Sequence, residues 1–313
     1  MLRVLTYHRI VDSNSLSIVT NVSAPPAAFR EQVRYLAENY NVVSMDDVLN
    51  AAQTGVELPD RAVLLTFDDA YRDFGEVAWP ILKTYGLPVT LFVPTAYPGD
   101  SSRVFWWDRI KASIMLTPKT ETQVAGREFR FRSQLERYRA YITILHCIED
   151  MPNEEAMQVV AQLSQSLGEF HARAPLVLSW PELRRLANEG VTLGAHTRTH
   201  PIMTRISAER TREEAAGSLK DLQREIGRVT PVFAYPAGRH DDHAVRILRE
   251  EGFVLGFTTM DGHNDLASAD PLRLRRTNIT PRTSMPIFRL RLLPAFAHLD
   301  ALRHRYAPRF FAA

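Results

Sequence analysis

The chain has 313 residues, of which 45% are hydrophobic and 24% are charged, as in an ordinary soluble globular protein. Its 38 Lys and Arg residues nearly balance its 36 Asp and Glu residues, and a formal net charge of +2 argues against a nucleic-acid-binding protein. Cys147 is the only cysteine in the sequence, which excludes an internal disulfide and a cysteine-based zinc cluster and fits a reducing compartment.

The N-terminal sequence MLRVLTYHRI places Tyr7, His8 and Arg9 before any apolar segment of signal-peptide length. The sequence also contains no run of about 18 apolar residues, so we expect no membrane-spanning helix. Together these features predict a cytoplasmic protein.

Short apolar segments rich in β-branched residues alternate with stretches of helical periodicity, which is typical of an α/β fold with a parallel sheet. Seven strands are predicted, beginning near Arg3, Ala62, Pro88, Val191, Pro231, Phe253 and Leu272. Helices are predicted between them at residues 27–39, 72–85, 181–189, 207–226 and 242–251. We therefore expect one domain over residues 1–280.

The alternation stops between the third and fourth predicted strands. No convincing strand occurs there, and the segment contains FWWDRIKASIML followed by two stretches of helical periodicity at 133–149 and 153–168. We predict a mainly helical insertion over residues 98–175 that belongs to the same domain.

Two adjacent carboxylates, Asp68 and Asp69, directly follow the predicted strand AVLLTF. Neighbouring like charges raise each other's pKa, and holding both ionised costs free energy unless a cation lies nearby. A turn or a helix cap, the alternative reading of an Asp at a strand end, needs only one such carboxylate. The pair therefore predicts a bound cation.

His196 and His200 follow the fourth predicted strand and are four residues apart. Carboxyl ends of parallel strands surround a common crevice, so these imidazoles are expected to lie near the Asp pair. Imidazole and carboxylate together are the usual ligands of Zn²⁺. The sequence predicts a divalent-metal site, with Zn²⁺ as the favoured ion.

Three motifs, TFDDAY, HTRTH and FAYPAG, resemble in order the first three motifs of the polysaccharide deacetylases of carbohydrate esterase family 4. The sequences YHRI and LSWPELRRLANEGVTLGAHTRTHP also resemble the bacterial exopolysaccharide branch of that family, and the resemblance covers about residues 1–98 and 176–280. It implies a distorted (β/α)7 barrel, in agreement with the seven predicted strands. It also implies hydrolysis of N-acetyl groups on aminosugars of a polysaccharide, oligosaccharide or lipid-linked glycan.

The resemblance assigns roles by position. Asp69, His196 and His200 would hold the divalent metal, and Asp68 would be the general base. The backbone N–H of Ala237 would help to bind the oxyanion, a role that tolerates a change of side chain.

The sequence departs from the family pattern at the arginine that often orients the catalytic Asp, because Ala234 occupies that position here. Arg276 in the last predicted strand is the expected replacement, and Arg239 is a second candidate. The alternative for each of the two is an ordinary surface arginine with no role in the site.

The family's terminal Leu-x-His, whose imidazole protonates the leaving amine, is also missing after the seventh predicted strand. Three other imidazoles are possible substitutes: His240, His243 and His263. A metal-bound water and protonated Asp68 are the alternatives.

We predict that His8, Tyr235 and Trp107 line the substrate pocket, since exposed Trp faces stack on sugar rings. The alternatives are a structural hydrogen bond for His8, filling of the barrel rim for Tyr235 and core packing for Trp107. Two other functions stay open, namely deformylation or another amide hydrolysis on a lipid-linked aminosugar, and a sugar-binding pseudoenzyme. The missing Arg and His favour the pseudoenzyme, whereas the complete set of base and ligands disfavours it.

The C-terminal tail, residues 281–313, interleaves arginines with Phe and Leu over 286–311, where Asp300 is the only acidic residue. Such a segment can lie on an anionic membrane, where each basic residue adds about 1 kcal/mol. We predict a peripheral membrane contact that flotation with anionic liposomes would detect. The alternative is a terminal helix packed on the barrel.

Overall fold

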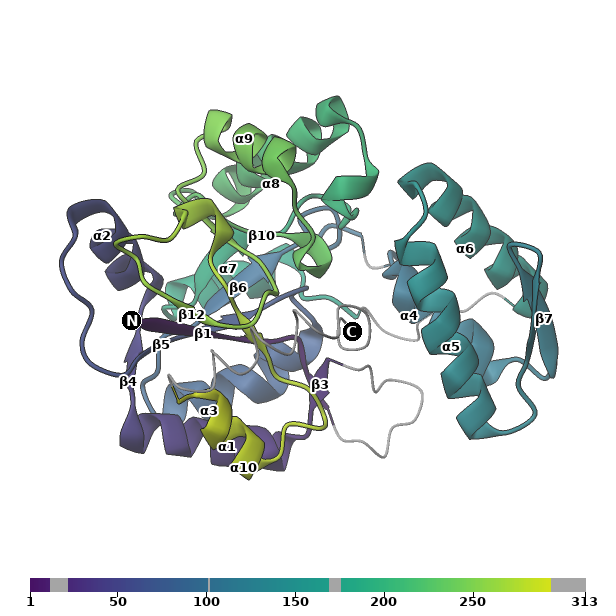
Figure 1. The fold of residues 1–313 in the computed structure, drawn as a ribbon, viewed down its shortest axis with the longest axis horizontal. Coiled ribbons are helices and arrows are strands. Elements are labelled where there is room, and N and C mark those ends of the chain that lie inside the picture. The colour runs from purple at the N-terminus through teal and green to yellow at the C-terminus, as the bar shows by residue number, and fades with distance from the viewer. Residues whose placement is uncertain (12–21, 101, 169–175, 294–313) are drawn as a thin grey trace.

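A curled, mostly parallel sheet forms the centre of the structure, and helices surround it (Figure 1). The computed structural model describes residues 1–11, 22–100, 102–168 and 176–293. Around the sheet, the neighbouring strands are β11 (Leu255–Phe257), β10 (Val232–Ala234), β9 (Thr192–Ala195), β6 (Thr90–Val93), β5 (Ala62–Phe67) and β1 (Leu2–Tyr7).

The seventh strand, β13 (Thr277–Asn278), closes the sheet. It pairs in parallel with β1, and Leu274 just before it forms a parallel bridge with Phe257 of β11. The predicted distorted (β/α)7 barrel is therefore confirmed, with all seven predicted strands present although several are shorter than expected.

Two unpredicted strands distort the barrel. β4 (Asn41–Val43) pairs with the first half of β5, so β6 reaches only the last two residues of β5. β12 (His263–Asn264) likewise runs antiparallel to the start of β1, and β13 pairs with β1 further along.

Alternate residues of β1 and β5 face the barrel interior. Val4 and Leu64 belong to an apolar cluster shared with β6, β10 and β11. The next inward positions, Thr6 and Thr66, are joined by a hydrogen bond of 2.7 Å between their Oγ1 atoms. Side chains alternate along a strand, so the next inward positions after Thr6 and Thr66 are His8 and Asp68. Both point toward the same end of the barrel interior.

The five predicted helices pack outside the sheet and are confirmed. They are α1 (Pro26–Asn39), α3 (Trp79–Thr84) with the π-helix η1 (Phe74–Ala78) before it, α7 (Trp180–Asn188), α8 (Ala208–Ile226) and α9 (Asp242–Glu250). The sequence did not predict α2 (Met45–Thr54). Helix α10 (Met285–Arg291) agrees with the alternative given for the start of the tail, a terminal helix packed on the barrel. The remaining short elements are β2 (Arg9–Ile10), β3 (Ser23–Ala24), and the 3-10 helices η2 (Met203–Arg205), η3 (Pro236–Gly238) and η4 (Pro271–Arg273).

The insertion lies beside the barrel and has its own apolar cluster (Figure 1). Its helices α5 (Gln134–Glu149) and α6 (Asn153–Leu167) are those that the periodicity predicted. A third helix, α4 (Trp106–Leu116), covers most of the FWWDRIKASIML segment, for which no helix was specified. The expectation of no strand was wrong, because β7 (Glu121–Val124) and β8 (Arg127–Arg130) form a hairpin. Ala125 and Gly126 both have positive φ, 48° and 76°, as the two central residues of a tight hairpin turn often do.

Helix α10 packs against the barrel and α1. Phe288 is fully buried, and its ring contacts that of Tyr35 at a centroid distance of 6.4 Å. Arg289 lies over the Tyr35 ring, and Arg291 donates to the carbonyl of Asn278 at 2.9 Å. Two of the tail arginines are therefore engaged within the fold. The rest of the tail, 294–313, lies outside the described residues, so the membrane contact stays a prediction.

None of the helices in the described part of the chain combines the length and the apolar character that crossing a membrane requires.

Candidate functional site

Three predicted ligands meet at the carboxyl ends of β5 and β9. The Oδ1 atom of Asp69 is 3.5 Å from Nε2 of His196 and 3.3 Å from Nε2 of His200. The two Nε2 atoms are 3.1 Å apart, and all three side chains are buried. Across the described residues, this is the one cluster of three or more His, Cys, Asp or Glu side chains that could hold a single ion.

The hydrogen bonds around these ligands fit a bound cation. The ring of His196 donates from Nδ1 to the carbonyl of Ala234 at 2.7 Å, which leaves a lone pair on Nε2 facing Asp69. Asp69 Oδ1 is buried and accepts no hydrogen bond of acceptable geometry from any described residue. Burying acceptor atoms that face one another costs folding free energy unless a positive group lies between them. One carboxylate oxygen and two imidazole nitrogens are ligands that suit Zn²⁺.

Backbone strain is concentrated in the loops that carry the ligands. Seven described non-glycine residues have positive φ, and five of them lie in these loops or in the turn after β10: Asp69 (72°), Ala70 (51°), Thr197 (62°), His200 (59°) and Ala237 (52°). Such conformations persist only where the surroundings enforce them, and they cluster at functional sites. The loops are therefore held in shape by their neighbours.

Asp68, directly before the first ligand, is bound by Arg276. The guanidinium donates from Nη1 to Oδ1 at 2.8 Å and from Nη2 to Oδ2 at 2.7 Å. Its Nε also donates to the carbonyl of Thr258 at 2.8 Å, so the planar group is fixed on both sides. Both partners are buried, at 2% exposure for Asp68 and 0% for Arg276. Arg276 thus makes the contact with Asp68 that is expected of the family's orienting arginine, whose place in the sequence is taken by Ala234 here.

Arg239, the second candidate for that position, lies elsewhere. Its Nη1 is 3.0 Å from Oδ1 of Asp150, at the end of the insertion helix α5. The structure therefore assigns the contact with Asp68 to Arg276 alone of the two.

The carboxyl group of Asp68 is held as a carboxylate. Burial by itself would raise the pKa of Asp68, but the charge of Arg276 and its hydrogen bonds to the carboxylate outweigh burial and hold this pKa below its ordinary value. An ionised carboxylate of fixed orientation can accept a proton from a neighbouring water.

His8 faces Asp68 from the end of β1. Its Nε2 lies 3.9 Å from Oδ2 of Asp68, its side chain is 14% exposed, and its Nδ1 has no hydrogen-bond partner among the described residues. Burial lowers the pKa of His8 and outweighs the opposite effect of Asp68 and Asp69. His8 is therefore an imidazole within the pocket and next to the carboxylate.

The other three imidazoles considered as proton donors contact groups other than Asp68. The ring of His240 packs against that of Tyr235 at a centroid distance of 5.0 Å, and its Nδ1 lies 3.1 Å from the carbonyl of Gly238. His243 contacts Arg246 on α9. His263 pairs with the first residues of β1, at the opposite end of that strand from the site.

Residues 55–256 match the family model described as polysaccharide deacetylase. The chain belongs to the polysaccharide deacetylase family. Polysaccharide deacetylases are hydrolases, so this chain belongs to a family of hydrolytic enzymes.

Relatives of this deacetylase-family chain agree with that assignment. A putative polysaccharide deacetylase, YxkH of Bacillus subtilis (strain 168), is 21% identical over 290 residues, which cover 92% of this chain and 74% of that protein. The poly-beta-1,6-N-acetyl-D-glucosamine N-deacetylase of Escherichia coli (strain K12) is 41% identical over 68 residues, but these cover only 21% of this chain and 10% of the relative. The match to the E. coli enzyme is thus confined to a small part of that protein.

A solved structure has the same fold. The Streptococcus pyogenes deacetylase PplD in complex with acetate superimposes with a TM-score of 0.64 at 22% identity, covering 94% of this chain and 98% of PplD. The likeness therefore includes the insertion as well as the barrel, because it extends over nearly the whole chain.

Two further predicted site residues of this deacetylase-family chain follow β10. Ala237 lies in the turn η3, with φ of 52°, at the same end of the sheet as the loop after β9, because β9 and β10 are parallel neighbours. Tyr235 is fully buried and its hydroxyl donates to the carbonyl of Leu272 at 2.9 Å. Because side chains alternate along the strand, Tyr235 points out of the barrel into the helix layer, and the structure does not support its predicted contact with substrate.

Trp107 adjoins the ligand His200. The two rings meet edge to face at a centroid distance of 4.6 Å, and the indole is only partly buried. Its Nε1 donates to the hydroxyl of Tyr71 at 2.9 Å, and that hydroxyl donates to Asp108 at 2.7 Å. A partly exposed indole of fixed orientation therefore borders the site.

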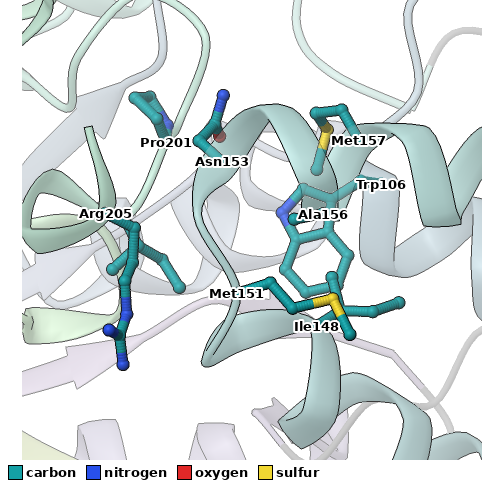
Figure 2. A pocket seen from close by; sticks show the side chains of 9 residues that line it. Trp106, Ile148, Met151, Asn153, Ala156, Met157, Pro201 and Arg205 are labelled. Carbon is teal, nitrogen blue, oxygen red and sulfur yellow. The ribbon is translucent and has the colours of Figure 1, made fainter. Parts of the chain in front are cut away.

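A small hollow lies beside the neighbouring Trp106, between the insertion and the barrel loops (Figure 2). It is lined mainly by apolar side chains: Trp106, Ile148, Met151, Asn153, Ala156, Met157, Pro201, Ile202 and Arg205. Asp150 connects its two sides, because it pairs with Arg239 at 3.0 Å and with Arg205 at 3.3 Å. The insertion is thus attached to the segment that follows His200 and to the turn that follows β10.

Proposed function

We propose that this protein is a metal-dependent N-deacetylase that removes N-acetyl groups from aminosugar residues of a polysaccharide, oligosaccharide or lipid-linked glycan. The observation that carries the proposal is the Asp68 carboxylate, held by Arg276 directly beside the cluster of Asp69, His196 and His200. The name of the E. coli relative, poly-beta-1,6-N-acetyl-D-glucosamine N-deacetylase, supports an N-acetylated aminosugar polymer as the substrate class.

The three ligand atoms would hold one divalent ion, with Zn²⁺ favoured by the imidazole and carboxylate donors. When bound, such an ion polarises the acyl carbonyl and lowers the pKa of a neighbouring water. The protein side of the site then has to orient this water, take its proton and protonate the leaving nitrogen.

Asp68 is the proposed general base. Arg276 occupies one lone-pair direction on each of its oxygens, and each oxygen keeps a second lone pair for the water. As the water oxygen bonds to the acetamide carbon, its proton passes to Asp68. The fixed orientation of the carboxylate reduces the entropy that must be lost at this step.

His8 is the proposed proton donor to the leaving amine. When the C–N bond breaks, Asp68 passes the proton that it received from water to the imidazole of His8, and His8 gives a proton to the leaving amine nitrogen. The 3.9 Å separation of His8 Nε2 and Asp68 Oδ2 makes this transfer geometrically reasonable after a small ring movement. The backbone N–H of Ala237 is the proposed oxyanion donor.

Trp107 is the proposed binding surface for the neighbouring part of the glycan. Its partly exposed indole borders His200. Flat aromatic faces suit the apolar faces of sugar rings.

Quantifying acetate and formate released from a panel of N-acetylated and N-formylated glycans tests the proposed reaction. We expect acetate from an N-acetylated glycan. Formate as the only product would instead show a deformylase, for which the same residues would serve. No release of either acid by the metal-loaded protein would indicate a sugar-binding pseudoenzyme, although Arg276 now fills the gap that favoured this alternative.

His8→Gln should lower kcat by about 10²-fold or more, because a positioned proton donor contributes on that scale. The bound metal should be retained, since His8 is not one of the three clustered ligands. Steady-state acetate release and metal analysis measure both effects, with His240→Gln as the matched control. An unchanged kcat for His8→Gln, or an equal loss for His240→Gln, would remove His8 from the mechanism.

A further inference from the structure

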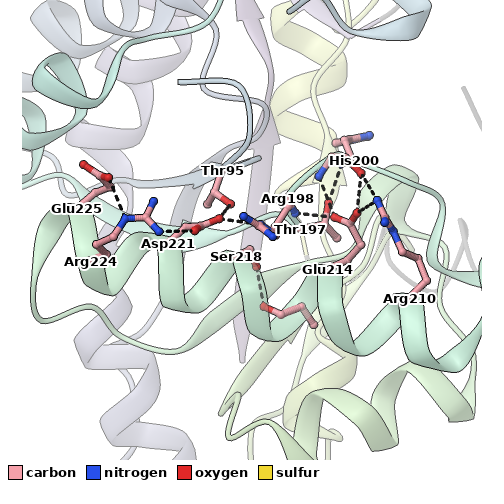
Figure 3. Close-up of polar contacts among 12 residues, drawn as sticks. Thr95, Thr197, Arg198, His200, Arg210, Glu214, Ser218, Asp221, Arg224 and Glu225 are labelled. Atoms are coloured by element: carbon pink, nitrogen blue, oxygen red, sulfur yellow. Dashed lines mark hydrogen bonds and ion pairs between the residues drawn. The ribbon is translucent and has the colours of Figure 1, made fainter. Parts of the chain in front are cut away.

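The loop that carries both imidazoles, residues 196–200, rests on one buried carboxylate of helix α8. Glu214 is 1% exposed, and its Oε2 accepts the backbone N–H groups of Arg198 and Thr199, each at 2.8 Å. Its Oε1 accepts the hydroxyl of Thr199 at 2.6 Å and Nη2 of Arg210 at 2.7 Å (Figure 3). Charge-assisted bonds of this kind are stronger than neutral ones.

The same helix has a glycine where the loop crosses it. A Cβ on Gly217 would lie 2.5 Å from Cδ of Arg198, so the arginine side chain occupies space that is free only because residue 217 has no Cβ. Beyond the glycine, Nε of Arg198 donates to Asp221 at 2.9 Å. Glycine inside a helix costs about 1 kcal/mol relative to alanine, so a packing requirement explains its presence here.

The chain after β6 holds the loop from the other side. The N–H of Thr95 donates to the carbonyl of Thr197 at 3.1 Å, and the N–H of Ala96 donates to the carbonyl of Arg198 at 2.9 Å. The side chain of Thr95 also donates to Asp221 at 2.8 Å, which connects this segment to α8. The loop is thus bonded on both sides, although Thr197 has positive φ.

We propose that Glu214, Gly217 and Asp221 form a positioning cradle on α8, and that this α8 cradle sets the metal affinity of the site. Two strained residues, Thr197 and His200, flank the backbone groups that Glu214 binds. By holding the turn in its strained form, the cradle keeps the two Nε2 atoms directed at Asp69 before an ion arrives. Outer groups that orient metal ligands typically change affinity by about 10- to 100-fold. The inference depends on the metal site of the proposed function.

The sequence did not reveal this role. Glu214 lies in TREEAAGSLKDLQRE, where charged residues at helical spacing look like a solvated helix face. The burial of one glutamate becomes visible only when the loop after β9 is placed over it.

Zinc affinity of purified apo-protein, measured by competition with a chromophoric chelator, tests the α8 cradle. Glu214→Ala should raise the dissociation constant by about 10- to 100-fold. Glu214→Gln should have an intermediate effect, because its one carbonyl oxygen can accept N–H groups but its amide cannot accept the hydroxyl of Thr199. Glu213→Gln is the matched control, since this neighbour on α8 has a 61% exposed side chain and should leave the constant unchanged.

Gly217→Ala provides a second variant in case Glu214→Ala does not fold. It improves the helix propensity of α8 but displaces Arg198, so it should also weaken zinc binding. Unfolding temperatures of the apo-variants separate the two kinds of role. A lower unfolding temperature with an unchanged zinc constant in both Glu214→Gln and Gly217→Ala would show a merely structural contact and overturn the inference. Wild-type protein that binds no zinc would overturn the proposed metal site as well, which distinguishes the two failures.

Discussion

Replacing Asp68 with Asn should lower kcat by about 10²- to 10⁴-fold, because the amide cannot take a proton from the attacking water. The metal content should stay that of the wild type, since the cluster that could hold the ion consists of Asp69, His196 and His200. Acetate release and metal analysis on the same preparation measure both quantities.

Asp69→Asn is the matched comparison for this variant. It should lose metal together with activity, because Asp69 Oδ1 is the oxygen that faces both imidazoles. If Asp68→Asn lost its metal while Asp69→Asn kept it, the roles of the two carboxylates would have to be exchanged.

Arg276→Met should lower the free energy of unfolding by about 3–5 kcal/mol, because it leaves the Asp68 carboxylate buried without its partner. Methionine fills much of the same volume without a charge. Urea denaturation of the metal-free protein measures the effect, since a bound ion would stabilise the folded state and hide part of it.

The double variant Asp68→Asn/Arg276→Met should be more stable than Arg276→Met alone, because it leaves no unpaired charge in the barrel. A double-mutant cycle isolates this coupling. Losses that simply add in the double variant would contradict a direct interaction between the two side chains.

Much of the fold could be predicted from the sequence because its signals are local. The buried strands β1 and β5 appear as unbroken apolar segments, and helices such as α8 show a clear period. The three proposed metal ligands could be placed near one another because the carboxyl ends of parallel strands converge.

What the sequence did not predict depends on contacts between distant segments. Asp68 and Arg276 are 208 residues apart in the sequence. Only the three-dimensional structure could therefore decide whether Arg276 or Arg239 contacts Asp68. The β7–β8 hairpin was missed because its buried residues, Val124 and Phe129, stand among charged neighbours. Tyr235 was placed in the pocket, whereas its side chain faces the helices. The face that it occupies depends on the residue at which β10 ends, and the sequence does not define that residue.

Stepwise addition of Zn²⁺ to chelator-stripped protein, with acetate release measured at each step, tests most directly whether Asp69, His196 and His200 form the catalytic metal site. We expect no activity in the stripped protein, a linear rise as zinc is added, and a plateau at one ion per chain. The His200→Ala variant should show no rise over the same range. Full acetate release by the stripped protein, or an undiminished rise in the His200→Ala variant, would contradict this assignment.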